Sequence, residues 1–465
     1  MRHLSSRFVI VLSSFALALS PALSTAAAQR PLPADSAVLA TIRERVETKR
    51  SSGMVVGLID ADGRRRTVAH GTGANGAPLD EHSVFEIGSV TKTFTGSLLA
   101  DMVARGEVRL DQPVAELLGP GVVIPERSGR KITLVDLATQ SSGLPRMPAN
   151  FAPKDPSNPY ADYDGAKMLG FLAGYQLPRD IGERYEYSNL GVGLLGFALA
   201  RKADMSYERL VAERLLRPLG MSESGITLTP AMSARLAPGH DRGLAPQRTW
   251  DLDALAGAGA IRSTVPDMLR YLAAHMDSTS RPLGRTLALT HERRASGPGP
   301  ALSLGLAWHR LNNATGDTIV WHNGETGGYH SFVGWDPARR VGVVILSNSA
   351  TSIDDIALHV LDDRLPLTKA ALQRTAVALA PEVLERYVGV YQLAPTFSIA
   401  VTREGAGLFL QATGQPRFPL FAEAEGKFFL RVVDAQVEFT KDSTGAVDAL
   451  ILVQGGGRQR GVRSK

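Results

Sequence analysis

The segment FEIGSVTKTFTG, residues 85–96, places a serine and a lysine three positions apart, Ser89 and Lys92. Three residues are slightly less than one helical turn, so the two side chains lie on one face of a helix. A lysine amine beside a serine hydroxyl can activate the hydroxyl as a nucleophile without a histidine. The unpaired N–H groups and the dipole of the first helical turn also favour developing negative charge. The spacing therefore predicts a serine nucleophile and a covalent acyl-enzyme.

The surroundings of Ser89 distinguish it from a second Ser-x-x-Lys match, Ser128-Gly129-Arg130-Lys131. About one such match is expected by chance in a chain of this size. The second match lies in a polar, glycine-containing stretch, which is typical of a solvated turn. Before Ser89, an extended segment (84–87) leads through Gly88, which allows a tight turn, into a pattern of helical period that ends at Gly106. A strand, a turn and a helix in this order present a nucleophile.

Composition excludes several classes of function. With 465 residues the chain is long for one domain, and 44% hydrophobic and 21% charged residues describe an ordinary globular protein. The net charge of +5 is small, and no basic run with interleaved aromatic residues indicates nucleic-acid binding. The absence of cysteine excludes a thiol nucleophile, disulfides and a cysteine-ligated metal. The His-Glu-x-x-His and Gly-x-Ser-x-Gly motifs of two other hydrolase classes are also absent.

The N-terminus has the pattern of a secretory signal peptide over residues 1–28. Arg2, His3 and Arg7 precede an apolar run over 8–23, and the small residues at 26–28 offer a cleavage site. The alternative is an N-terminal membrane anchor, but the apolar run is short for a spanning helix. We therefore expect a periplasmic or secreted enzyme without a stable membrane span after the signal is removed.

Hydrophobic periodicity predicts that strands at both ends of one domain form a single antiparallel sheet covered by helices on both faces. A hairpin is expected over 54–60 and 65–70, turned at Asp62-Gly63. The further strands are expected over 319–322, 329–336 and 341–347, and helices over 34–50, after Ser89, around Leu134, after Ser188, and over 207–217, 265–276, 353–361 and 368–379. This domain is expected to span residues 29–379.

The pattern changes at Ala380-Pro381, after which short β segments alternate with turn residues. Six strands are expected over 397–403, 408–413, 418–422, 428–433, 436–441 and 450–454. Short, regularly spaced strands indicate a small all-β barrel or sandwich over 380–465. Because this region contains no chemical motif, we interpret it as a packing module that shapes or shields the cleft, with a binding role as the alternative.

The segment at 85–96 resembles the active-site segment of class C β-lactamases and of the DD-peptidases, D-aminopeptidases and esterases related to them. Further segments resemble the family in its own order: ITLVDLATQSSGLP (132–145), GERYEYSN (182–189), RPLGM (217–221), AGAIRST (258–264) and HNGETGGY (322–329). The resemblance covers roughly residues 35–365. It implies an α+β fold of the β-lactamase/transpeptidase type, an antiparallel sheet with helices on both faces plus an all-helical lobe. The C-terminal region resembles the lipocalin-like barrel appended to some members.

The resemblance assigns roles to the motif residues. Ser89 is the expected nucleophile, and Lys92 and Tyr187 are both candidate bases. Lys92 acts as a base only when neutral, and Tyr187 acts as one only when nearby cations lower its pKa from about 10. Asn189 is expected to hydrogen-bond both Lys92 and the substrate amide, with a helix N-cap as the alternative or additional role. Which base acts in which step stays open.

The resemblance also implies an oxyanion hole from the backbone N–H groups of Ser89 and Glu325. Two such donors stabilise the negative charge of the acyl-transfer transition state. His322, Asn323 and Gly324 are the expected substrate-binding residues, and glycines nearby let a substrate backbone approach. We expect no metal and no cofactor.

The segment His322-Asn323-Gly324 departs from class C β-lactamases, which have Lys-Thr-Gly there. That lysine would hold the substrate carboxylate, since opposite charges ~4 Å apart attract by about 4 kcal/mol gross at an effective dielectric of roughly 20. A mostly neutral histidine cannot replace the charge, although it can donate a hydrogen bond. Thr91 in place of a small residue and the absence of glutamine in 144–148 are further departures.

The sequence thus predicts an exported serine hydrolase acting on D-amino-acid peptides, as DD-carboxypeptidases and D-aminopeptidases do, or on small esters. The alternatives are a class C-like β-lactamase and a penicillin-binding sensor or cell-wall binding module that acylates without turnover. The expected partner is a small-molecule or peptide substrate, such as a cell-wall peptide or a β-lactam.

Overall fold

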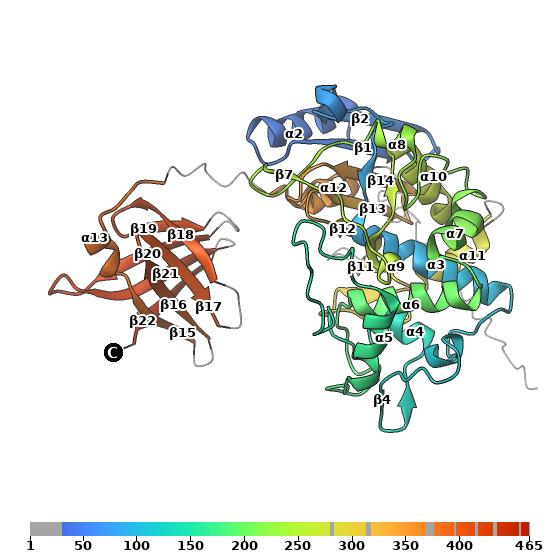
Figure 1. The fold of residues 1–465 in the computed structure, drawn as a ribbon. Coiled ribbons are helices and arrows are strands. Elements are labelled where there is room, and N and C mark those ends of the chain that lie inside the picture. The colour runs from blue at the N-terminus through green and yellow to red at the C-terminus, as the bar shows by residue number, and fades with distance from the viewer. Residues whose placement is uncertain are drawn as a thin grey trace, which may run out of the picture. The chain divides into compact units, whose positions relative to one another are not determined.

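The structure, a computed structural model, describes residues 30–279, 283–312, 318–368, 376–394, 397–413, 417–430, 435–454 and 457–464. The expected signal peptide lies outside the described residues. The chain divides into two compact units, Met1–Leu367 and Thr368–Lys465 (Figure 1). This division falls twelve residues before the boundary expected from the sequence at 379–380. Among the described residues, no helix is long and apolar enough to cross a membrane.

The first unit contains an eight-stranded antiparallel sheet in the order β2-β1-β14-β13-β12-β11-β10-β9. Its strands are β1 (Gly53–Ile59), β2 (Arg65–Gly71), β9 (Ala295–Ser296), β10 (Leu302–Leu304), β11 (His309–Asn312), β12 (Thr318–Glu325), β13 (His330–Asp336) and β14 (Val341–Ser347). β1 pairs with β14, so both ends of the unit build one sheet, as predicted. β9, β10 and β11 extend the sheet beyond the strands expected from the sequence.

The two faces of the sheet pack against different helices, as predicted. α2 (Asp35–Glu47) and α12 (Asp354–Leu361) cover one face and form a core with Met54, Val56 and Leu58 of β1. α10 (Val265–Met276) covers the other face, where Gly57 lets it approach closely, because a Cβ there would lie 2.5 Å from Val265. Because side chains alternate along a strand, each strand contributes to both cores.

The helical lobe packs beside α3 (Thr91–Ala104), which follows the turn η2 (Gly88–Val90). α6 (Asn189–Lys202) contacts α3, α4 and α9. The other helical segments are η1 (Ala74–Gly76), η3 (Val114–Leu117), α4 (Leu134–Ala138), α5 (Gly165–Gly174), α7 (Tyr207–Val211), a π turn (Ala212–Leu216), α8 (Pro230–Ser233), α9 (Ala256–Gly259), α11 (Gly284–Ala288) and η5 (Leu289–His291). Three two-stranded pairs are β3 (Phe85–Glu86) with β8 (Arg262–Ser263), β4 (Glu126–Arg127) with β5 (Arg130–Lys131), and β6 (Gly239–His240) with β7 (Pro246–Gln247).

The second unit is a closed eight-stranded antiparallel barrel, which confirms the predicted all-β fold (Figure 1). A short helix, α13 (Pro381–Glu385), precedes the strands β15 (Gly389–Ala394), β16 (Phe397–Glu404), β17 (Gly407–Ala412), β18 (Arg417–Ala424), β19 (Lys427–Leu430), β20 (Ala435–Lys441), β21 (Val447–Gln454) and β22 (Gly457–Arg463). The rings of Tyr387, Tyr391, Phe428 and Phe439 contact one another in its core. Of the helix expected over 368–379, residues 369–375 lie outside the described residues and the remainder is not helical.

Candidate active site

Ser89 lies in the turn that connects β3 to α3, and its side chain is partly exposed. Gly88 makes this turn possible, because its φ is +47° and a Cβ there would lie 2.9 Å from the backbone N and O of Glu325. Lys92 follows in the first turn of α3, and its Nζ donates a hydrogen bond to the Ser89 Oγ at 2.8 Å. The structure therefore brings the two residues of the first motif into direct contact. Ser128, in contrast, lies exposed in the turn between β4 and β5, as expected.

Lys92 is completely buried, and its Nζ also donates to the carbonyl oxygen of Ala258 at 2.7 Å. Burial lowers the pKa of the Lys92 amine well below its usual value, and the positive charge of Arg146 lowers it further. Among the described residues, no carboxylate forms an ion pair with Lys92. The lowered pKa favours the neutral amine, which is the form that can accept a proton from the Ser89 hydroxyl.

Tyr187 lies directly before α6, and its ring centroid is 4.9 Å from the Lys92 Nζ. Withdrawal of the phenol from water raises the pKa of Tyr187 far above its usual value, although a hydrogen bond with Ser89 and the charge of Arg146 oppose the increase. The expectation that cations pull this pKa down is thus corrected, since desolvation outweighs them. The structure keeps Tyr187 protonated, a state in which a phenol donates a proton rather than accepting one.

Asn189 is the first residue of α6, but it does not cap the helix. Ser188 is the N-cap, since its Oγ accepts from the Gly191 N–H at 2.8 Å. The Asn189 Nδ2 contacts the Met147 Sδ at 3.7 Å, and its Oδ1 is buried without a hydrogen-bond partner among the described residues. The expected hydrogen bond to Lys92 is therefore not formed. An unpartnered buried acceptor beside the nucleophile is suited to receive an N–H of a bound substrate.

Alternation along β12 separates the three residues of the His322-Asn323-Gly324 motif. His322 is buried and stacks on His309 at 4.8 Å between ring centroids. Asn323 points to the opposite face, where its Nδ2 donates to the Asp354 Oδ2 of α12 at 2.6 Å. Gly324 faces the nucleophile again. The structure thus directs the Asn323 side chain away from Ser89 and leaves His322 and Gly324 on the side of the nucleophile.

His322 faces Tyr187, with 6.5 Å between ring centroids, and is held neutral. Burial lowers the pKa of His322 well below its usual value, and the neighbouring His309 and Lys92 lower it further. Gly324 lets β12 approach the nucleophile, since a Cβ there would overlap the carbonyl oxygen of Ile87 and lie 2.9 Å from the Ser89 nitrogen. The absence of a side chain is therefore a requirement of the site at this position.

The backbone N–H of Glu325 points toward the edge of β12 that lies opposite β13. Thr326 donates its N–H to the Tyr329 carbonyl at 3.0 Å, and successive N–H groups of a strand point to opposite edges. On that other edge, pairing with β11 stops at Trp321. The Glu325 carboxylate itself is exposed and pairs with Arg242 at 2.7 Å. The N–H of Glu325 is thus available beside Ser89.

A cavity of about 30 Å³ lies beside Ser89. Two aromatic rings that no sequence motif indicated, those of Tyr160 and Trp250, line it with 5.2 Å between their centroids. Asn189 and Glu325 line it as well. A narrow aromatic cavity beside a nucleophile favours a compact, partly apolar substrate group.

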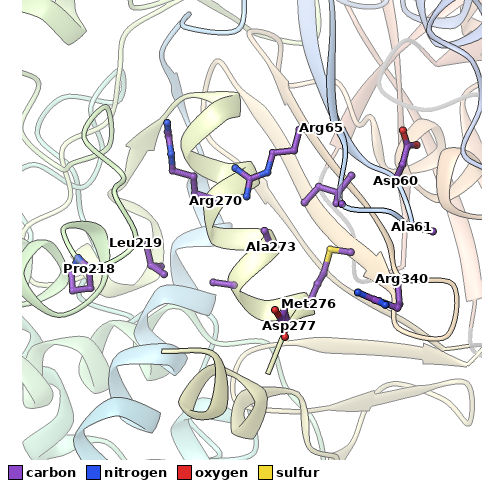
Figure 2. A pocket seen from close by; sticks show the side chains of 13 residues that line it. Asp60, Ala61, Arg65, Pro218, Leu219, Arg270, Ala273, Met276, Asp277 and Arg340 are labelled. Carbon is purple, nitrogen blue, oxygen red and sulfur yellow. The ribbon is translucent and has the colours of Figure 1, made fainter. Parts of the chain in front are cut away.

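A larger cavity of about 410 Å³ lies elsewhere in the same unit, against α10 (Figure 2). Arg65, Arg270 and Arg340 line it together with Pro218 and Leu219 of the RPLGM segment, whereas none of the expected catalytic or substrate-binding residues does. Arg270 pairs with Asp267 at 2.6 Å. The chemistry of the motifs is therefore not located in this cavity.

Arg146 and the Ala258 carbonyl complete the surroundings of Lys92 and Tyr187. Ala258 begins the AGAIRST segment, but no role was predicted for it, and no role was predicted for Arg146. Arg146 lies in the SGLPRMP stretch, which drew attention only because it lacks a glutamine. Its guanidinium carbon lies 4.9 Å from the Tyr187 ring centroid. The type of residue was visible in the sequence, but its approach to a residue about forty positions later was not.

The chain matches the family model described as Beta-lactamase over residues 38–364. The chain belongs to the Beta-lactamase family. It is 29% identical over 309 residues to the D-alanyl-D-alanine-carboxypeptidase/endopeptidase AmpH of Escherichia coli K12, a match that covers 64% of this chain and 79% of AmpH. It is 28% identical over 416 residues to penicillin-binding protein 4* of Bacillus subtilis 168, a match that covers 83% of this chain and 89% of that protein. A β-lactamase of Pseudomonas fluorescens is 26% identical over 345 residues, a match that covers 66% of this chain and 91% of that β-lactamase.

Solved structures agree with this assignment at the level of the fold. The D-alanine carboxypeptidase AmpC of Burkholderia cenocepacia has a TM-score of 0.60 and 23% identity, with 71% of this chain and 99% of that chain covered. A class C β-lactamase of Rhodobacter sphaeroides has a TM-score of 0.61 and 24% identity, with the same coverage. Residues 373–460 match the domain of unknown function DUF3471. The catalytic unit is thus an enzyme of a family of serine β-lactamases and DD-carboxypeptidases.

Proposed function

We propose that this protein is an exported serine hydrolase that forms an acyl-enzyme on Ser89 with D-amino-acid peptides, as DD-carboxypeptidases and D-aminopeptidases do, or with small esters. The observation that carries the proposal is the 2.8 Å contact between the Ser89 Oγ and a Lys92 amine that is completely buried and lacks an acidic partner among the described residues. A neutral amine at this distance is a general base for the hydroxyl.

The reaction begins when the Lys92 Nζ takes the Ser89 proton and the Oγ attacks the carbonyl carbon of the substrate. The backbone N–H groups of Ser89 and Glu325 hold the resulting oxyanion. Tyr187 gives a proton to the leaving group, which then departs. Tyr187 regains a proton from Lys92. A water molecule then loses a proton to the pair of Lys92 and Tyr187 and attacks the acyl carbon. The pair passes this proton to the Ser89 Oγ as the Oγ leaves. Each residue ends in its starting state.

Three observations support D-amino-acid peptides and esters as substrates. The name of AmpH, a relative, describes a D-alanyl-D-alanine carboxypeptidase and endopeptidase. The unpartnered Oδ1 of Asn189 offers an acceptor for an amide N–H, and the cavity beside Ser89 suits a compact group such as an alanine methyl. The signal-like N-terminus supports a periplasmic or secreted location, where cell-wall peptides occur.

A class C-like β-lactamase is the second candidate, since several relatives are named β-lactamases. A penicillin-binding sensor that acylates without turnover is less well supported, because Lys92 and Tyr187 remain in place for deacylation. A panel of nitrocefin, a D-Ala-D-Ala peptide, a D-amino-acid anilide and a p-nitrophenyl ester separates these functions. We expect steady turnover of the peptide, the anilide or the ester to exceed that of nitrocefin. Faster nitrocefin turnover would select the β-lactamase, and a burst without turnover would select the sensor.

A further inference from the structure

Arg146 is held beside the candidate active site by its backbone. Its carbonyl oxygen accepts hydrogen bonds from the N–H groups of Asn189 at 3.0 Å and Leu190 at 3.3 Å, at the start of α6. Three residues earlier, Gly143 with a φ of +82° turns the chain toward this position. The Arg146 side chain is exposed. The main chain is thus fixed to the helix that begins with Asn189, while the guanidinium remains accessible from solvent.

The guanidinium of Arg146 stacks against the catalytic tyrosine and is otherwise unoccupied. Its central carbon is 4.9 Å from the Tyr187 ring centroid, within the range of a cation–π contact. Other arginines near the site are paired, Arg242 with Glu325 and Arg248 with Asp155. No described residue forms a hydrogen bond or an ion pair with the Arg146 guanidinium. Its N–H donors are therefore free for a ligand.

Arg146 also provides positive charge where the neighbouring residues provide none. Burial lowers the pKa of both Lys92 and His322 and so disfavours their charged forms. The charge of Arg146 acts on Lys92 and on the phenols of Tyr160, Tyr185 and Tyr187. The cleft consequently has a cation beside Tyr187, although the motif lysine of class C β-lactamases is replaced by histidine.

We propose that Arg146 binds a carboxylate of the substrate, and that the enzyme therefore prefers substrates with a free carboxylate close to the scissile bond. The proposal rests on the function proposed above. A guanidinium offers two parallel N–H donors that match the two oxygens of a carboxylate, and a ring beneath it restricts its plane. Tyr187 contacts both Ser89 and Arg146, so the two groups are separated by one side chain. That separation suits a carboxylate on the substrate residue that is released when the scissile bond is cleaved.

This assignment reverses an expectation drawn from the sequence. The loss of the motif lysine at His322 predicts discrimination against substrates with a carboxylate beside the scissile bond. Arg146 supplies the missing charge from another segment of the chain, on the loop before α6 instead of on β12.

The test compares two esters that differ only in charge, N-acetyl-D-alanyl-D-lactate and its lactamide. We expect wild-type enzyme to prefer the acid, and Arg146→Gln to lower the acid-to-amide ratio of kcat/KM about 10- to 100-fold, the range of a lost hydrogen bond to a charged group. Arg146→Lys should retain part of the ratio, since it keeps the charge without the paired donors. Arg65→Gln, an exposed arginine in the other cavity, should leave the ratio unchanged. An unchanged ratio in Arg146→Gln would overturn the proposal.

A second measurement covers the case in which the variants fail to fold. In wild-type enzyme, rising salt should lower kcat/KM for the acid more than for the amide, because exposed charge pairs are screened beyond about 8–10 Å. Equal salt dependence for both esters would contradict carboxylate binding. Ser89→Ala separates this inference from the proposed function. Full turnover in that variant would refute the acyl-enzyme itself, whereas its loss together with an unchanged ratio in Arg146→Gln would refute only the role of Arg146.

Discussion

The Ser89 hydroxyl accepts a hydrogen bond at 2.8 Å from a Lys92 amine that has no exposed surface. A charged amine at such a position costs free energy, and deprotonation removes that cost. The same burial that destabilises the ammonium therefore prepares the base. We therefore propose Lys92 as the proton acceptor and Tyr187, whose pKa is raised, as the proton donor.

Replacement of Lys92 should separate stability from activity. Lys92→Met removes the amine and keeps a flexible apolar side chain of similar length. We expect kcat to fall at least ~10²-fold, the range for lost acid–base catalysis, while Tm stays constant or rises because a buried polar group is gone. Steady-state kinetics and thermal unfolding measure both effects. A variant that retained activity would exclude Lys92 as the base.

Tyr187→Phe should lower kcat by at least ~10²-fold and leave the ring in place against Arg146. Because the phenol is the proposed donor, the loss should be smaller for a p-nitrophenyl ester, whose leaving group needs no proton, than for a peptide. Rates on both substrates, with intact-mass detection of accumulated acyl-enzyme, check this. An equal loss for both substrates would contradict a donor role in the departure of the leaving group.

The pH–rate profile should show an acid limb that reports Lys92. Its pKa is lowered by burial and by Arg146, and His309, His322 and Tyr187 surround the same amine. The rate should rise as pH passes through this lowered pKa, because only the neutral amine accepts a proton. Arg146→Gln removes a cation that lowers the pKa, so the limb should move to higher pH. Arg65→Gln should leave it in place, and a shift to lower pH in Arg146→Gln would contradict the arrangement.

Gly324→Ala should disrupt the site, whereas Gly170→Ala should not. A Cβ at position 324 would overlap the Ile87 carbonyl oxygen and crowd the Ser89 nitrogen. A Cβ at Gly170, inside α5, meets no atom within 4 Å, and alanine there should stabilise the helix by about 0.5–1 kcal/mol. We expect Gly324→Ala to lose most of its activity and to have a lower Tm. Gly170→Ala should keep its activity and have a slightly higher Tm. Unimpaired activity in Gly324→Ala would mean that β12 does not lie against Ser89.

Local pattern predicted the elements that are long and regularly apolar. The predicted helix over 265–276 and the predicted strand over 341–347 coincide with α10 and β14. β9 to β11 were missed because they are short and contain polar residues, so neither a helical nor a strand-like alternation of apolar residues is visible. α5 was missed because its glycines hide a helix that Asp164 caps through the Lys167 N–H.

The site was predictable where one motif supplies both partners and not where distant segments meet. Ser89 and Lys92 share one helical face, so their contact follows from spacing alone. Arg146 meets Tyr187 only through the packing of the loop before α6, a relationship that no local pattern contains. The pKa of Tyr187 was also misjudged, because the extent of its desolvation depends on long-range packing.

The most direct test of the account is to find the residue that becomes covalently labelled. The protein should be treated with a fluorescent phosphonate or a penicillin, digested and examined by mass spectrometry, with Ser89→Ala and Ser128→Ala in parallel. We predict one adduct on the Ser89 peptide, equal labelling of Ser128→Ala, and no labelling or turnover in Ser89→Ala at nearly unchanged Tm. An adduct on another residue, or full activity in Ser89→Ala, would contradict it.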